Sequence, residues 1–172
     1  DTVTHVEFSP NGHLMVSSSD DGTIKIWDVV SGKELKSLKG HSTFVKTVIF
    51  TLDGKNLISA GNDRKIRVWD VSTGQQQKVL SGHEDCIFSL DLSSDGNLLA
   101  SGDANGEIKI WDTLNWNEIA SYSQGRSYSY NQQIEDLTFT ADNKFIISGS
   151  QNGSLMFYDL RKKEVIKEIK NL

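Results

Sequence analysis

The sequence has very little of several residue types that define particular classes of protein. It contains a single cysteine, Cys86, so no disulfide can form within the chain. This cysteine content agrees with a reducing compartment, and we expect a cytoplasmic protein. The chain has no apolar run of about 18 residues, which excludes a transmembrane helix. Residues 1–5 show none of the features of a secretory signal.

Positive charge and catalytic motifs are also scarce. The 18 Lys and Arg residues are outnumbered by 23 Asp and Glu residues, for a net charge of −5. Binding to nucleic acid needs clustered basic side chains, so we expect no nucleic-acid partner. Without a transmembrane stretch, we expect no membrane partner either. The sequence has no Gly-rich phosphate loop with a lysine, no HExxH and no CxxC. We therefore expect no catalytic, cofactor-binding or metal site, and no enzymatic activity.

What the chain does contain is an internal repeat. An aromatic residue followed by Asp recurs at intervals of 42, 42 and 47 residues, at Trp27, Trp69, Trp111 and Tyr158. A serine stands ten residues before each of these positions, at Ser17, Ser59, Ser101 and Ser148. A Gly-His pair recurs at Gly40-His41 and Gly82-His83. Self-similarity at a fixed spacing indicates a repeat architecture.

Within each repeat, apolar residues alternate with a period of two, which predicts strands. In the second repeat the expected strands are residues 45–50, 56–60, 66–70 and 77–80. Turn pairs such as Asp53-Gly54 suit short hairpins. Each repeat is thus predicted to be a four-stranded antiparallel sheet, which must stack on a neighbour to bury its apolar faces.

The Gly-His pair, the serine, the Asp or Asn that follows it and the Trp-Asp pair resemble the WD40-repeat β-propeller family. The resemblance implies an all-β fold with four consecutive four-stranded antiparallel blades around a channel. The approximate blades are residues 1–39, 40–81, 82–124 and 125–172. Propellers of this family usually close with more blades, so we expect part of a seven- or eight-bladed ring. The remaining blades would lie in the same chain or in a second copy.

The repeated His, Ser and Asp suggest a catalytic triad, but the resemblance implies a different role. In this family His, Ser, Asp and Trp form a buried hydrogen-bonded tetrad that fixes the loops of a blade. The second blade has the complete set, which is His41, Ser59, Asp63 and Trp69. The third has His83, Ser101, Asn105 and Trp111, with Asn105 in place of the carboxylate, and the first has Ser17, Asp21 and Trp27.

The resemblance also implies that partners bind at the channel-end face of the propeller. The positions that correspond to family contact sites include Phe44, Lys46, Asn62, Phe88, Gln133 and Glu135. Tyr128 and Tyr130 lie in the five extra residues of the fourth repeat, where insertions often serve binding. Phe44 and Phe88 are aromatic where other repeats are polar, so each either anchors a partner or packs on a neighbouring blade.

These features predict a non-catalytic scaffold that binds protein or peptide partners. One alternative is a sensing or regulatory module of a larger enzyme or signalling ATPase. A second is a substrate receptor of a cullin–RING ubiquitin ligase, because residues 146–161 resemble the box of such receptors. Asn152 stands where that box has Asp.

Overall fold

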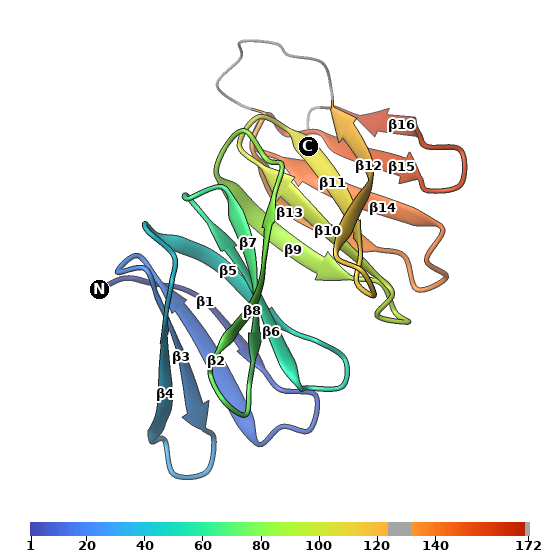
Figure 1. Cartoon of the computed structure of the whole chain (residues 1–172). Coiled ribbons are helices and arrows are strands. Elements are labelled where there is room, and N and C mark those ends of the chain that lie inside the picture. Colours follow the sequence, from blue (N-terminus) through green and yellow to red (C-terminus); the bar gives the residue numbers. More distant parts are fainter. Residues whose placement is uncertain (124–131, 171–172) are drawn as a thin grey trace. The chain divides into compact units, whose positions relative to one another are not determined.

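The computed structural model describes residues 1–123 and 132–170, which form strands and turns without a helix (Figure 1). The strands make four antiparallel sheets of four strands, and in each sheet the strands pair in sequence order. The predicted all-β architecture of four consecutive four-stranded sheets is therefore confirmed.

Each repeat supplies one sheet. The first sheet contains β1 (Val3–Phe8), β2 (Leu14–Ser19), β3 (Thr23–Asp28) and β4 (Glu34–Lys39). The second contains β5 (Val45–Phe50), β6 (Asn56–Gly61), β7 (Lys65–Asp70) and β8 (Gln76–Ser81). The third contains β9 (Ile87–Leu92), β10 (Leu98–Asp103), β11 (Glu107–Asp112) and β12 (Asn117–Ser123). The fourth contains β13 (Ile134–Phe139), β14 (Phe145–Ser150), β15 (Leu155–Asp159) and β16 (Glu164–Ile169).

The turn between the first two strands of each sheet is closed by a side chain. In the fourth sheet, the Thr140 hydroxyl donates to Oδ1 of Asp142 at 2.7 Å, and the Lys144 backbone N–H donates to the same oxygen at 3.2 Å. These hydrogen bonds lower the pKa of Asp142 to about 2. The same role falls to Asn11, Asp53 and Asp95 in the other sheets. Asx turns of this kind are the physical reason for the repeated turn residues.

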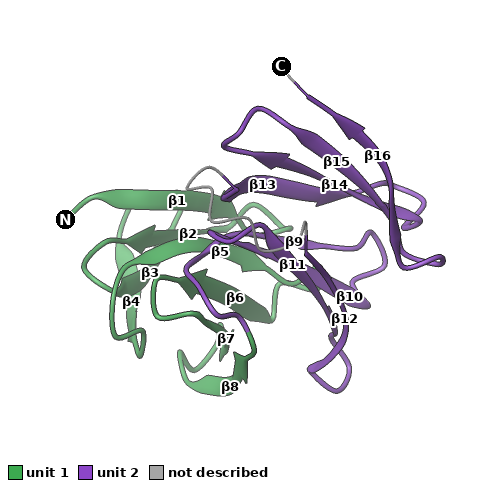
Figure 2. Cartoon of the chain, turned by 90° about the horizontal axis from the view of Figure 1, so that it is seen from above, with its two compact units in different colours: residues 1–82 green, residues 83–172 purple. Residues whose placement is uncertain are grey.

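The chain divides into two compact units, residues 1–82 and residues 83–172 (Figure 2). In the first unit, β1 and β2 of the first sheet pack on β5 of the second. Three side chains of β1 also reach the backbone of β5. Thr4 donates to the Val45 carbonyl at 2.6 Å, His5 Nδ1 lies 2.9 Å from the Val48 carbonyl, and Glu7 accepts the Phe50 N–H at 2.6 Å.

The apolar core of this unit joins both sheets. Its buried members are Val16, Ile24, Ile26, Leu38, Val45, Val48, Phe50, Leu57, Trp69 and Val71. A single four-stranded sheet exposes both faces, so this shared core holds the unit together.

The second unit repeats the arrangement with β9 and β10 packed on β13. Asp91 accepts the Phe139 N–H at 2.8 Å, which is the contact that Glu7 makes in the first unit. Its buried core contains Ala100, Ile108, Ile110, Tyr122, Ile134, Leu137, Phe139, Ile146, Met156 and Tyr158. A carboxylate on the first strand of one sheet thus secures the first strand of the next sheet in both units.

The first sheet has an apolar face that no described residue covers. Val3, Val6 and Phe8 of β1 are 58%, 54% and 60% exposed. The equivalent residues of β5, which the first sheet covers, are 0%, 0% and 5% exposed: Val45, Val48 and Phe50. We call Val3, Val6 and Phe8 the open face. Since the residue types match, the difference comes from the neighbouring sheet alone.

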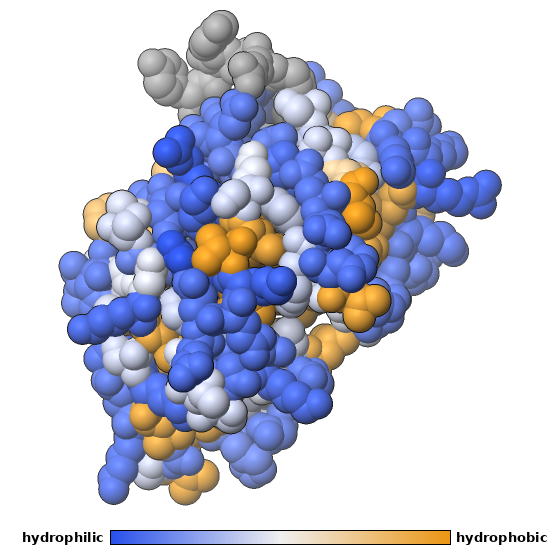
Figure 3. All heavy atoms as spheres, in the orientation of Figure 1, coloured by the Kyte–Doolittle hydropathy of each residue, from blue (hydrophilic) through white to orange (hydrophobic). Residues whose placement is uncertain are grey.

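The last strand of each sheet is largely exposed, with Leu38, Leu80 and Tyr122 as buried exceptions. In the view of Figure 3, hydrophilic side chains cover most of the surface, and hydrophobic atoms form separate patches. The apolar residues of the repeat therefore serve mainly the packing of sheet on sheet.

Candidate binding surface and the buried polar networks

A continuous chain of hydrogen bonds crosses the second sheet. The Trp69 indole N–H donates to Ser59 Oγ at 2.9 Å, and Ser59 Oγ lies 2.8 Å from His41 Nε2. His41 Nδ1 lies 2.9 Å from Oδ1 of Asp63, and Oδ2 of Asp63 accepts a hydrogen bond from Arg67 at 3.1 Å. Because the indole donates to Ser59, the hydroxyl proton is free for His41 Nε2, and Nδ1–H then donates to Asp63.

This network has the members of a catalytic triad but lacks the access that catalysis requires. Ser59 is completely buried, and Trp69 is 2% exposed. The hydroxyl of Ser59 is already committed to Trp69 and His41. A substrate carbonyl cannot reach it, so the arrangement fixes the loop around Asp63 onto the sheet.

Asp63 carries the negative charge of this network. Burial alone would raise its pKa, but hydrogen bonds from His41 and Arg67 hold the pKa of this carboxyl well below its usual range. Asp63 is therefore ionised throughout the neutral range and remains a strong acceptor.

The first and fourth sheets have shorter versions of the network. Trp27 donates to Ser17 Oγ at 2.9 Å, whereas Asp21 accepts the backbone N–H and the hydroxyl of Thr23 and closes a turn. In the fourth sheet, Ser148 Oγ lies 3.5 Å from the Tyr158 hydroxyl.

The third sheet differs from the predicted arrangement. Trp111 donates to Ser101 Oγ at 2.9 Å, and Ser101 Oγ lies 2.6 Å from His83 Nε2, as expected. The partner of His83 Nδ1, however, is Oδ2 of Asp103 at 2.9 Å. The assignment of Asn105 to this role was wrong. Asn105 is exposed, and its backbone N–H donates to Oδ1 of Asp103.

The repeat spacing concealed this substitution because Asp103 aligns with Gly61 of the second sheet, whereas Asn105 aligns with Asp63. The sequence signal that points to Asp103 is a carboxylate at the end of a strand, at a position where the other repeats have a small residue. Asp103 is completely buried, and buried charges need partners.

The second residue of each Trp-Asp pair, or of the Tyr-Asp pair, has a separate role. Oδ1 of Asp70 accepts the Thr73 N–H at 2.7 Å and the Ser72 hydroxyl at 2.6 Å. Asp28, Asp112 and Asp159 accept hydrogen bonds at the corresponding turns. These carboxylates hold the hairpin between the third and fourth strands.

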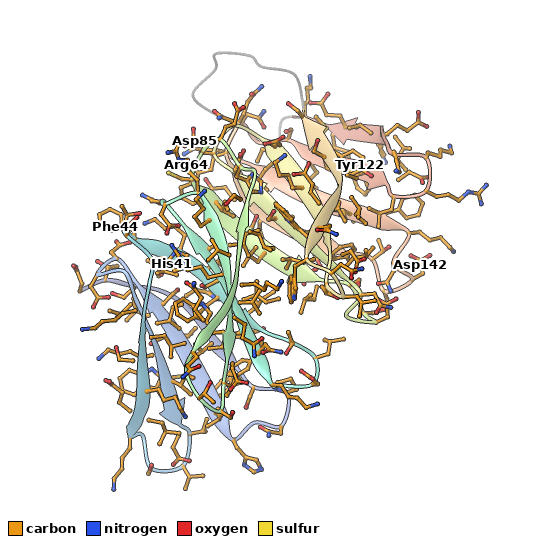
Figure 4. All side chains as sticks on the ribbon, in the orientation of Figure 1. His41, Phe44, Arg64, Asp85, Tyr122 and Asp142 are labelled. Carbon is orange, nitrogen blue, oxygen red and sulfur yellow. The ribbon has the colours of Figure 1, made fainter. Side chains whose placement is uncertain are left out.

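Three of the candidate partner-binding residues lie together at the start of β5. Phe44, which is labelled in Figure 4, is 45% exposed, and Lys46 Nζ lies 5.0 Å from the centre of its ring. Lys46 is in turn paired with Oδ1 of Asp20 in the first sheet at 2.8 Å. The Asn62 N–H donates to the Phe44 carbonyl at 2.9 Å. We call Phe44, Lys46, Asp20 and Asn62 the Phe44 cluster.

The candidates of the second unit are less prominent. Phe88 is half-buried. Gln133 donates from its side-chain amide to Glu135 at 2.9 Å, so these two residues are brought together. Tyr128 and Tyr130 lie outside the described residues.

Comparison with known proteins decides the family. The family model described as "WD domain, G-beta repeat" matches residues 1–28, 32–70, 74–112 and 123–159, most of the chain and all four sheets. The chain belongs to the WD40 repeat family.

Individual WD40 relatives match short stretches of the chain. "Nuclear distribution protein PAC1-2" of Uncinocarpus reesii is 53% identical over 38 residues, 22% of this chain and 8% of that protein. "Probable serine/threonine-protein kinase PkwA" of Thermomonospora curvata is 49% identical over 41 residues, 24% of this chain and 6% of that protein. "Dynein assembly factor with WD repeat domains 1" of Danio rerio is 42% identical over 48 residues, 28% of this chain and 12% of that protein. The matches thus span a small part of these relatives.

Residues 1–123 and 132–170 contain no helix that is long and hydrophobic enough to cross a bilayer.

Proposed function

We propose that this WD40 chain is a non-catalytic scaffold that binds protein or peptide partners, and that the Phe44 cluster is a principal contact. The proposal rests mainly on one observation: the aromatic ring of Phe44 is exposed, and the ammonium of Lys46, which is paired with Asp20, lies over it. Membership of the WD40 family and the names of its relatives, which include a dynein assembly factor, support a role in protein interaction. We place this activity in the cytoplasm.

The Phe44 cluster has the properties of a preformed contact site. The ring of Phe44 is 45% exposed, although four apolar side chains of β5, the strand that directly follows it, are buried. The pair of Lys46 with Asp20 fixes the ammonium over the ring, so little side-chain entropy is lost when a partner binds. Exposed aromatic residues contribute strongly to interfaces when a partner covers them.

The test is partner binding by the Phe44→Ala variant. Partners are captured with the purified protein, and the affinity of an identified partner is then measured directly with purified components. We expect Phe44→Ala to weaken binding by about tenfold or more. Leu52→Ala is the control, because Leu52 is 51% exposed and follows the opposite end of the same strand. Equal affinity of Phe44→Ala and the wild type would contradict the proposed contact.

A second function, as the regulatory module of a larger enzyme, is favoured by the similarity to a probable protein kinase. The matched stretch is only 6% of that kinase. Intact mass and phosphotransfer activity of the purified protein distinguish the two functions. A catalytic domain in the same polypeptide would make the scaffold a sensor for that domain.

We also propose that a further WD40 blade covers the open face of Val3, Val6 and Phe8. The support is the burial of the matching residues of β5 under the first sheet. The covering blade belongs to the same polypeptide or to a second copy, and in either case contributes to a seven- or eight-bladed ring. Native mass spectrometry distinguishes these cases. If the covering blade belongs to a second copy, the assembly has twice the mass of one chain, and the Phe8→Ser variant shifts toward the monomer.

A further inference from the structure

His83, at the entrance to the third sheet, lies beside two carboxylates. Its Nδ1 is 2.9 Å from Oδ2 of Asp103 and 3.8 Å from Oε2 of Glu107. His41 in the second sheet has one carboxylate partner, because Gly61 and Lys65 align with Asp103 and Glu107. The third blade thus has a group of possible ligands that the otherwise similar second blade lacks.

The charges of this group do not balance. Glu107 and Glu118 both pair with Lys109, at 3.1 Å and 3.2 Å. Lys109 is the only ammonium or guanidinium within ion-pair distance of Asp103, Glu107 or Glu118 in the described part of the chain. Three carboxylates therefore face one cation when the imidazole is neutral. Asp63 in the second blade faces one guanidinium, that of Arg67, so its charge is matched.

Such an excess is costly for the members of the group that are shielded from water. Asp103 is completely buried, and the side chains of His83 and Glu107 are 1% and 23% exposed. Lys109 is itself buried, and its ammonium is held between Glu107 and Glu118. A further positive charge beside His83 would stabilise the remaining carboxylate charge.

We propose that His83 Nδ1, Asp103 Oδ2 and Glu107 Oε2 form a binding site for a divalent cation of the Zn²⁺ type. Each of the three residues offers one ligand atom that lies within 4.8 Å of those of the other two. Ligands at about 2.0–2.1 Å in a tetrahedral Zn²⁺ site are about 3.3 Å apart, so the 2.9 Å and 3.8 Å separations require only small adjustments. Imidazole with carboxylate oxygen suits Zn²⁺, whereas Mg²⁺ prefers oxygen alone.

The surroundings of the three ligands are suited to hold them in place. With a metal ion on Nδ1, the imidazole proton resides on Nε2 and is donated to Ser101 Oγ. Ser101 also accepts from Trp111, and its hydroxyl donates to the Lys109 carbonyl at 3.5 Å. Lys109 holds the other oxygen of Glu107. Ligands oriented by such outer contacts are typical of metal sites.

The backbone of the β10–β11 turn completes these contacts. The N–H groups of Asn105 and Glu107 both donate to Oδ1 of Asp103 at 2.9 Å, which leaves Oδ2 for the ion. Asp103 ends β10, Glu107 begins β11, and His83 precedes β9. A bound ion would therefore tie the entrance of the third blade to the β10–β11 turn and stabilise the fold of the second unit.

The proposal is tested by titrating the chelator-treated protein with Zn²⁺ in a calorimeter, with Mg²⁺ as a comparison ion. We expect one saturable Zn²⁺ site, a higher unfolding temperature with Zn²⁺, and no comparable effect of Mg²⁺. Glu107→Gln should weaken Zn²⁺ binding by about tenfold or more, since even outer contacts of a metal contribute this much. Glu107 lies outside the chain of bonds from Trp111 to His83 and Asp103, so this variant should fold.

Glu118→Gln is the matched control. It removes one carboxylate from the same charged group but no ligand, and should keep Zn²⁺ affinity within about threefold. Failure of the wild type to bind Zn²⁺ would overturn the proposal. Equal affinity of Glu107→Gln and the wild type would also overturn it, because the bound Zn²⁺ would then lie elsewhere.

Discussion

Nδ1 of His83 lies 2.9 Å from Oδ2 of Asp103, a residue two positions ahead of the one that the repeat assigns to this contact. The second and third blades thus fix the same histidine with carboxylates from different positions. In the second blade the carboxylate comes from the turn, at Asp63, and in the third it comes from the end of β10.

Asp103→Asn should therefore destabilise the protein, whereas Asn105→Ala should not. The first change removes a buried charged acceptor, and we expect a loss of about 1–3 kcal/mol in the free energy of unfolding. Asn105 is exposed, so its change should stay within about 0.5 kcal/mol. Urea unfolding in the presence of a chelator measures both values without a contribution from metal. A larger loss of unfolding free energy for Asn105→Ala than for Asp103→Asn would contradict this assignment and favour Asn105, the position that the repeat predicts.

His41→Ala and Asp63→Ala should each lower the free energy of unfolding by about 1–3 kcal/mol, since each leaves a buried partner unsatisfied. Lys55→Ala is the control, because this side chain is 79% exposed, and little change is expected. Thermal unfolding followed by circular dichroism is sufficient. Unchanged stability in both variants of the network would contradict its structural role.

Stability should depend on the charge of Asp63 at acid pH. Its pKa is lowered in the folded protein, so the unfolded chain takes up the proton first as pH falls. The contribution is complete above the unfolded value of about 4 and is lost progressively at lower pH. Unfolding free energies of the wild type and Asp63→Asn, measured from pH 7 to pH 3, should converge toward the acid end. A difference in unfolding free energy that stays constant from pH 7 to pH 3 would exclude ionised Asp63 as the source of the pH-dependent stability.

Gly61→Ala should destabilise the second sheet by about 1–3 kcal/mol. A Cβ at this position would collide with the backbone carbonyl of Phe44 and come within 2.9 Å of the Val45 Cα. Gly149→Ala in β14 is the control, because the nearest atom, a Leu155 methyl, lies at 3.6 Å. Comparable unfolding midpoints for the two variants would contradict this prediction and show that β5 can move away from a methyl group at position 61.

Much of the candidate site followed from the sequence because it depends on local spacing. The alternation of Ile66 and Val68 predicts a strand whose apolar side chains face the core, and both are buried. Ser59 and Trp69 are ten residues apart on adjacent strands, so the hairpin register brings their side chains together. The selection of Asp103 over Asn105 was not predictable in this way, because it depends on which of the two side chains reaches the imidazole.

The sequence alone determined the repeat, the four-stranded sheets and the family, because period-two alternation and turn residues act within each repeat. Tertiary structure decided which apolar residues are covered. Val6 and Val48 are the same residue at the same position of the repeat, yet one is 54% exposed and the other is completely buried. Burial depends on the sheet that packs against a strand, and that is a property of the neighbour rather than of the strand itself.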